Sequence, residues 1–465
     1  MKFQILVPDS ATSERQYIIP LILNEFLGID IELTPDKAQK HVSISFEGKN
    51  LSLPDTFFTV YNQHRLVNVS LPSLPLKKVD FCFNALPKHL KGKKIPIIYG
   101  EKMTGEPTNH SDNNLFIEID IFGSAFFMLT RYEEAVLSDK DTHNRFPAHA
   151  SVAYKENFIN RPIINEYIDI LWAAMNELWP NIKRKIRKFR QLISCDVDFP
   201  YHPSTTSILQ LCIRLAGDFI GKRSMTSAIY HWSNYWLCKK GDYSQDPYFT
   251  FSWMMSECEN AETHCVFNFI TDTSNRKRDG YYNISEPIIR KLLREIYSRG
   301  HEIGLHTTYD SYTSAEKIQQ EFNTLRSCCK NEGVNQNEWG GRQHYLRWKT
   351  PLSFKNWDQA QLNYDSTLGY ADQAGFRCGI CYEYPVYDLT NRRALSLRER
   401  PLILMETSVF GDMYMSKNFD SNTLNYMKQL KSTCRAYNGD FTLLWHNSKL
   451  RTDQERTFYK ALLSA

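Results

Sequence analysis

The segment Leu192-Ile193-Ser194-Cys195-Asp196-Val197-Asp198 places two carboxylates directly after a short apolar run. Such a run predicts a buried strand, and side chains two residues apart on a strand point to the same side. Two like charges held so close either raise one pKa or share a cation. Both arrangements suit catalysis, since one carboxylate can hold a metal while the other takes a proton. The plainer alternative is a strand end that carries two solvated acids.

The rest of the C-terminal half alternates strands and helices. Residues 265–270, 302–305 and 443–445 are predicted strands, and 207–260 are predicted to be largely helical. This alternation predicts an α/β domain with parallel strands, whose catalytic groups gather at the carboxyl ends of the strands. His306 and His446 each follow such a strand, so we expect them to lie near Asp196 and Asp198.

One predicted helix in this half carries clear boundary signals. Ser285 is expected to cap it, Pro287 lies in its first turn, and Gly300 is expected to end it.

The N-terminal part has a different pattern, with several short strands (3–7, 41–46 and 115–121) and two predicted helices (125–134 and 164–178). Residues 182–190 form the most basic segment, which is either a solvated linker or a patch for a phosphate group or a membrane surface. We expect a mixed α+β N-terminal domain over 1–150, a helical and basic linker over 151–190, and an α/β domain over 191–465.

The composition and the net charge exclude some classes of function. Hydrophobic residues make up 42% and charged residues 23% of the 465 residues, and the net charge is +4, which argues against nucleic acid as a partner. The run 3–7 is too short for a signal peptide, and no stretch has the roughly 18 consecutive apolar residues of a membrane span. We expect a cytoplasmic protein with its 11 cysteines reduced. The sequence does not indicate the oligomeric state.

Residues 190–450 resemble the polysaccharide deacetylase family, the carbohydrate esterases that share the NodB homology domain. Asp196-Val197-Asp198 is similar to the first motif of the family, and Gly300-His301-Glu302-Ile303-Gly304-Leu305-His306 is similar to the second. The resemblance implies a distorted (β/α)7-type barrel. It implies that Asp196 is the catalytic base and that Asp198 and His306 are metal ligands, whereas His301 is structural.

The second motif departs from the family at its second ligand histidine, where this chain has Asp310. Asp310 is a candidate third ligand, since carboxylates bind divalent metals, but it is equally placed to cap the following helix. The other candidate third ligand is His344, in Gly340-Gly341-Arg342-Gln343-His344-Tyr345.

The third and fourth motifs supply further candidates. By resemblance Arg342 orients the catalytic base, with Arg347 as an alternative, and Tyr345 lines the substrate site. Asp365 is expected to tune a neighbouring arginine or histidine. Arg377 is expected either to bind substrate or to pair with a carboxylate.

The fifth motif is Leu443-Leu444-Trp445-His446-Asn447, in which His446 resembles the general acid; the alternative is a satisfied buried histidine. The segments 122–134 and 145–148 resemble an accessory domain of bacterial deacetylase-like proteins. Within the first of them, Arg131-Tyr132-Glu133-Glu134 is expected to be a surface salt-bridge cluster, or else a docking face.

The resemblance implies a hydrolase that removes an N-acetyl group from an amino sugar in a polysaccharide or glycan precursor. It also implies a divalent cofactor, zinc first, with cobalt, nickel or manganese as alternatives. Two other functions are considered: an inactive deacetylase-like protein that binds carbohydrate or acts as a scaffold, and an amidohydrolase for a non-sugar C–N bond. Among substrates, a lipid- or nucleotide-linked sugar precursor is preferred.

Overall fold

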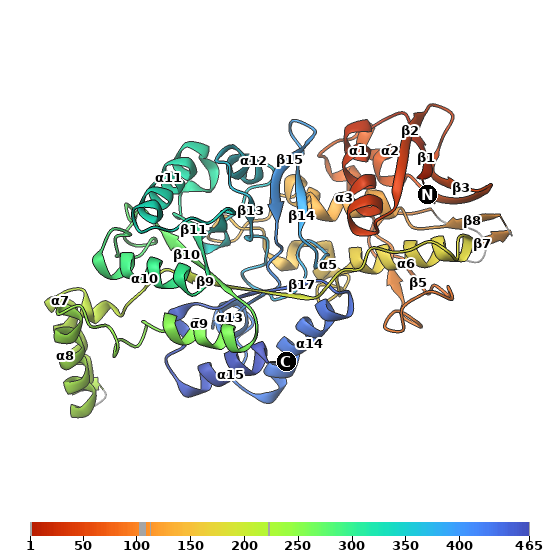
Figure 1. Ribbon diagram of the computed structural model, residues 1–465. Helices are drawn as coiled ribbons and strands as arrows, with labels where there is room; N and C mark the ends of the chain where they lie inside the picture. Colours follow the sequence, from red (N-terminus) through yellow and green to blue (C-terminus); the bar gives the residue numbers. More distant parts are fainter. Residues whose placement is uncertain (1, 102–107, 112, 222–223, 465) are drawn as a thin grey trace.

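The computed structural model describes residues 2–101, 108–111, 113–221 and 224–464. Two sheets organise the chain (Figure 1). The N-terminal sheet has the strand order β2-β1-β3-β4-β8-β7. Its strands are β1 (Lys2–Pro8), β2 (Asp30–Asp36), β3 (His41–Phe46), β4 (Lys49–Pro54), β7 (Thr108–Ser111) and β8 (Asn114–Ile117). A short pair, β5 (Lys78–Val79) and β6 (Ile95–Pro96), stands apart from it.

The helices of the N-terminal part are α1 (Thr12–Pro20), α2 (Thr56–Gln63), α3 (Ile121–Leu129), α4 (Tyr132–Val136), α5 (Val152–Lys155) and α6 (Ile163–Leu178). Of these, α1 packs on β2 of the N-terminal sheet. Helix α3 is buried along its whole length, and α6 packs on α3, β4 and β8. The chain then runs without regular structure over 182–189 to the second sheet.

The second sheet has nine strands in the order β14-β15-β13-β12-β11-β10-β9-β17-β16 and curls into part of a barrel. Its strands are β9 (Arg190–Val197), β10 (Cys265–Ile270), β11 (Glu302–Thr307), β12 (Gly340–Gln343), β13 (Tyr364–Asp365), β14 (Tyr384–Asp388), β15 (Arg393–Glu399), β16 (Leu404–Met405) and β17 (Asp440–Leu444). All neighbours pair in parallel except β14 with β15. The predicted parallel α/β arrangement is therefore confirmed for this half.

The helices of this half are α7 (Ile208–Ala216), α8 (Met225–Lys239), α9 (Phe251–Asn260), α10 (Pro287–Ser298), α11 (Ala315–Asn331), α12 (Leu352–Gln359), α13 (Glu406–Phe410), α14 (Ser421–Ala436) and α15 (Asp453–Leu463). Helices α9, α10, α11 and α14 pack on β10, β11 and β17. Among the described residues, no helix has the length and apolar character needed to cross a membrane.

Two local expectations are wrong. The residue before α10 is Glu286 rather than Ser285, and no side chain caps that helix end. The predicted helix 125–134 is two helices, since Arg131 has a left-handed φ of 53° between α3 and α4.

The cluster around Arg131 is buried, not on the surface. Arg131 pairs with Glu133 and Glu134, both at 2.8 Å, and donates through Nη1 to the Arg377 carbonyl oxygen at 2.5 Å. Burial and these carboxylates act on Arg131 in opposite directions, and the carboxylates keep its pKa above the usual range. Because Arg377 belongs to the second half of the chain, this cluster joins the two halves.

Candidate active site

Six polar side chains meet where neighbouring strands of the nine-stranded sheet end. Asp196 lies in β9 with Asp198 just beyond it, and His306 lies in β11. The other three follow strand ends: His344 follows β12, His446 follows β17 after Trp445, and Glu406 follows β16. Since these strands are parallel, their carboxyl ends face one edge, which explains why residues so distant in sequence converge.

Two side chains donate hydrogen bonds to Asp196. Its Oδ1 accepts from Arg342 Nη1 at 2.8 Å and from Asn268 Nδ2 at 2.7 Å. A Cβ at residue 304 would lie 2.0 Å from Asn268 Oδ1, so glycine leaves the room that Asn268 occupies. Burial raises the pKa of Asp196, but Arg342 and two histidines outweigh it, so the pKa stays below its ordinary value. Asp196 is therefore ionised, with Oδ2 turned towards His306 at 3.7 Å.

The tautomers of His306 and His344 follow from their outer contacts. His306 Nδ1 lies 2.9 Å from the Arg342 carbonyl oxygen, and His344 Nε2 lies 2.7 Å from that of Arg278. A carbonyl oxygen only accepts, so each of these nitrogens carries the hydrogen. The inner nitrogens, His306 Nε2 and His344 Nδ1, lie 2.9 Å apart, and neutral His344 presents the lone pair of Nδ1 to His306. His306 Nε2 can donate a proton to that lone pair, or, when it is deprotonated, can bind a cation together with it.

Asp198 completes this set of donors. Its Oδ1 lies 3.3 Å from His306 Nε2 and 3.5 Å from His344 Nδ1. Within the described part of the chain, this buried oxygen accepts no hydrogen bond. Ligands about 2.0–2.1 Å from a tetrahedral zinc ion lie roughly 3.3 Å apart, close to the three separations seen here. Asp198, His306 and His344 thus form a candidate metal site whose donors fit a divalent cation.

The charges around this site favour a cation as well. Burial lowers the pKa of His306, but Asp196 and Asp198 outweigh it and raise the pKa above its ordinary value. Burial lowers the pKa of His344 to about 4, which keeps that ring neutral and able to donate a lone pair. The carboxylates therefore favour positive charge at this point, either as a proton on His306 or as a bound cation.

His446 lies on the other side of Asp198, with Nε2 3.6 Å from Asp198 Oδ2. Its Nδ1 lies 2.6 Å from Glu406 Oε1. Burial lowers the pKa of His446, but the Glu406 carboxylate outweighs it and raises the pKa to about 9. The ring is therefore protonated at neutral pH and points Nε2 into the pocket.

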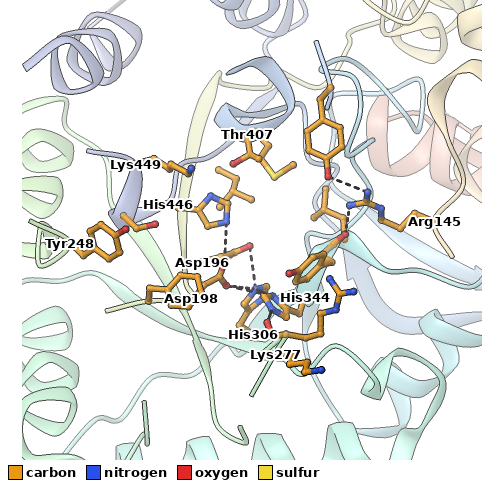
Figure 2. A pocket seen from close by; sticks show the side chains of 18 of the residues that line it. Arg145, Asp196, Asp198, Tyr248, Lys277, His306, His344, Thr407, His446 and Lys449 are labelled. Carbon is orange, nitrogen blue, oxygen red and sulfur yellow. Dashed lines mark hydrogen bonds and ion pairs between the residues drawn. The ribbon is translucent and has the colours of Figure 1, made fainter. Parts of the chain in front are cut away.

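A cavity of about 340 Å³ opens above these groups (Figure 2). Its walls include Tyr345, Tyr248 and Phe199, and its only acids among the described lining residues are Asp196 and Asp198. Five cations surround it and are here called the cationic rim: Arg145, Lys277, Arg278, Lys449 and Arg451. The volume suits a monosaccharide-sized group, and the rim favours a ligand that carries negative charge.

The N-terminal half supplies part of this wall. Arg145 donates from Nη1 to the Tyr345 carbonyl oxygen at 3.0 Å and from Nη2 to the Tyr414 hydroxyl at 3.2 Å. His143 Nδ1 lies 2.9 Å from the Tyr309 hydroxyl.

Of the two candidate third ligands, the structure brings only His344 to Asp198 and His306. The Asp310 side chain is 55% exposed and lies 3.3 Å from Arg347 Nη1. Asp310 precedes the short helix Ser311–Thr313, yet its side chain makes no capping hydrogen bond. Arg347 is occupied by the His143 carbonyl oxygen and by the Tyr309 ring, so Arg342 alone of these two arginines contacts Asp196.

Two more predicted residues lie outside the pocket. Arg377 is buried and pairs with Glu134 at 2.6 Å, the carboxylate alternative of the prediction. Asp365 accepts from Thr367 Oγ1 at 2.5 Å, while Arg342 binds the neighbouring Ser366 through its carbonyl and hydroxyl oxygens. The positive charge of Arg342 also acts on Asp365, and the two residues share the loop around Ser366.

Sequence reasoning missed Glu406, Asn268 and Arg145. Glu406 follows a strand of two residues, too short to show a periodic pattern. Asn268 lies inside a predicted strand, where the period of two places it on the side that faces Asp196. Arg145 was noted only as part of the N-terminal resemblance, and nothing in its local sequence indicates a distant pocket.

Parts of this chain are similar to a protein family and to a solved structure. Residues 3–180 match a family of unknown function (DUF7033), and this stretch contains His143 and Arg145. A search of curated proteins found no match. A structure search found a chain from Mycobacterium smegmatis provisionally described as a polysaccharide deacetylase, at 12% identity, TM-score 0.35, and coverage of 60% of this chain and 85% of that one.

Proposed function

We propose that this protein is a metal-dependent hydrolase that removes the acetyl group from an N-acetylated amino sugar. One observation carries the proposal: two histidine ring nitrogens and a carboxylate oxygen without a hydrogen bond converge beside an ionised Asp196 and a protonated His446. We take zinc as the metal, with cobalt, nickel or manganese as alternatives. We also propose that the curled sheet is a variant of the (β/α)7 deacetylase barrel.

A divalent ion on Asp198, His306 and His344 would polarise the acetyl carbonyl and lower the pKa of a water molecule. Asp196 accepts a proton from the water molecule while the water oxygen bonds to the acetyl carbon. Arg342 holds the Asp196 carboxylate in position. His446 gives its Nε2 proton to the sugar nitrogen as the C–N bond breaks, since an unprotonated amide nitrogen is a poor leaving group. The products are acetate and the free amine.

The cationic rim narrows the substrate class within this proposal. Lys277 and Lys449 are exposed at the pocket. The described lining residues include no acid besides Asp196 and Asp198. We therefore propose that the sugar bears a negative group such as phosphate, which fits a lipid- or nucleotide-linked precursor. A neutral polymer would give Lys277 and Lys449 no charged partner, whereas Arg145 of the rim already pairs with Asp141 at 2.7 Å.

The decisive experiment combines metal analysis with turnover. Purified protein should contain one divalent ion per chain by elemental analysis, and Asp198→Ala should contain none. Acetate release from N-acetylated amino sugars, with and without phosphate, is then compared with hydrolysis of small cyclic amides. Turnover of the amides alone would replace this proposal with an amidohydrolase for a non-sugar bond.

A protein without bound metal and without turnover would instead be a carbohydrate-binding or scaffold protein. That alternative drew on the missing second histidine of the family motif. His344 supplies a ligand atom at 2.9 Å from His306, so the donor set does not depend on a histidine at position 310.

A further inference from the structure

A helical hairpin projects from the end of the molecule opposite the N-terminal sheet (Figure 1). It consists of α7, the short helix Gly217–Gly221 and α8, and it is inserted between β9 and α9. Helices α7 and α8 pack mainly on each other and on the short helices beside them. Most of the hairpin surface is therefore not used for folding the body of the protein.

The surface of this hairpin is unusually apolar. Of the 17 large apolar side chains that are exposed in the described residues, ten lie between Ile208 and Trp236. They range from 38% to 80% exposed and include Ile213, Ile220, Ile229, Trp232 and Trp236. Single exposed apolar residues are normal, but a concentration of this kind marks an interaction surface.

The hairpin contains more basic than acidic residues. Residues 206–240 contain five lysines and arginines and one acid, a balance of +4 that equals the net charge of the whole chain. The single acid, Asp218, is buried, with His231 and Arg214 at 3.6 and 3.9 Å. Among the described residues of this range, Lys239 and Lys240 are exposed, and the exposed acid Asp242 follows them.

We propose that this hairpin docks the protein on an anionic phospholipid surface. An apolar face with tryptophans and flanking lysines is what an interfacial helix presents to lipid, with tryptophan rings at the headgroup level and lysines on the phosphates. Soluble protein partners also bury apolar faces, but the excess of basic over acidic residues in 206–240 favours an anionic surface. The helices lie on the membrane and do not cross it.

The hairpin begins and ends at the pocket. Phe199 and Tyr248, on either side of it, both line the cavity. Asp246 ties its base together by accepting from the His202 backbone N–H at 3.0 Å. Docking would hold the pocket close to the lipid headgroups, where a lipid-linked sugar would present its phosphate to the cationic rim. The docking itself does not rest on the proposed hydrolysis.

The test uses the full chain and sedimenting vesicles of phosphatidylcholine, with or without about one-third phosphatidylglycerol. The protein should sediment with the anionic vesicles, less so in high salt, and remain in solution with the neutral ones. Trp232→Ser combined with Trp236→Ser should weaken binding at least about ten-fold, since it removes two interfacial anchors. Tyr154→Ser combined with Met413→Ser removes two exposed apolar side chains elsewhere and should leave binding unchanged.

A labelled thiol gives a second readout without altering the tryptophans. Cys82 and Cys212 are the exposed cysteines of the described chain, and Cys212 lies in α7. An environment-sensitive dye on Cys212 in a Cys82→Ser protein should shift to shorter wavelength with anionic vesicles. The same dye on Cys82 in a Cys212→Ser protein should not shift.

Several outcomes overturn the proposal: no sedimentation with anionic vesicles, equal binding by the double tryptophan variant, or no shift at Cys212. A concentration-dependent dimer in solution that the tryptophan variant abolishes, without vesicle binding, would assign the hairpin to a second copy of the chain. Asp198→Ala should bind vesicles normally, so failure of docking and failure of the proposed activity are distinguishable.

Discussion

Glu406 Oε1 lies 2.6 Å from His446 Nδ1, and the opposite nitrogen of that ring lies 3.6 Å from Asp198 Oδ2. The imidazole is thus held between two carboxylates from different strand ends. Burial opposes its positive charge, but Glu406 outweighs burial and raises the pKa of His446 to about 9. This is the protonation state that a proton donor needs at neutral pH.

Glu406→Gln should weaken that donor while keeping the shape of the site. Removing the negative charge lowers the pKa of His446, so the protonated ring is lost at a lower pH. The alkaline limb of the kcat/KM profile should move down by about one pH unit or more. Glu338→Gln, at an exposed glutamate outside the pocket, should leave the profile unchanged. An unaltered alkaline limb in the first variant would contradict the assignment.

The third metal ligand is tested by a matched pair of substitutions. His344→Ala removes a lone pair that faces His306 at 2.9 Å, so bound metal and turnover should both be lost. Asp310→Ala removes a half-exposed side chain whose contacts are Arg347 and Asn275, so one metal per chain should remain. Elemental analysis after dialysis distinguishes the two, and a reversed result would return the ligand role to Asp310.

Arg342 should act on the reaction through Asp196. Arg342→Met leaves a buried carboxylate without its guanidinium, which costs about 3–5 kcal/mol of unfolding free energy. It should also raise the pKa of Asp196, so the acid limb of the rate profile should move to higher pH. Arg342→Lys restores charge without the planar fork and should recover part of the activity. If kcat falls with no movement of the acid limb, Arg342 has only a structural role.

The cationic rim should discriminate between substrates. Lys277→Met combined with Lys449→Met should raise KM for a phosphorylated N-acetyl sugar by about ten-fold and make it less sensitive to salt. The KM for a neutral sugar should hardly change. Lys317→Met, at an exposed lysine on α11, is the control. An equal effect on both sugars would argue against recognition of a negative group.

Glu321 should make stability depend on pH. Burial raises the pKa of this carboxyl to about 7, although Thr308 donates to it from its backbone and hydroxyl. A raised pKa in the folded state means that stability is full below about pH 4.5 and falls as the pH rises through 7. Glu321→Gln should remove that fall, of the order of 1–3 kcal/mol between pH 4.5 and 8 by urea unfolding. Glu316→Gln, exposed on the same helix, should not.

Strands with long apolar runs could be read from the sequence, and short ones could not. The strands β9, β10, β11 and β17 are five to eight residues long and contain buried apolar side chains. The structure confirms a strand at each of these predicted places. β13 and β16 have two residues each, and their pairing depends on neighbours distant in sequence. Glu406 was missed for this reason, since its place at the sheet edge depends on β16 pairing with β17.

The choice between the alternative roles of Asp310, His344 and Arg377 also required the three-dimensional structure. Asp310 and Arg377 had the right residue types for a ligand and a substrate contact. Their partners, Arg347 and Glu134, lie 37 and 243 positions away in the sequence, beyond any local pattern. His344 became the better candidate ligand only when β12 was seen beside β11.

The guanidinium of Arg145 donates both to the Tyr345 carbonyl oxygen and to the Tyr414 hydroxyl. A residue from the first third of the chain therefore forms part of the wall of a pocket whose other residues come from the last two thirds. The two halves are therefore not interchangeable modules. A fragment limited to 191–465 would have an open side where Arg145 stands, and exchange of the N-terminal region for an unrelated one would alter which molecules enter. The shape of the pocket therefore depends on residues from both halves of the chain.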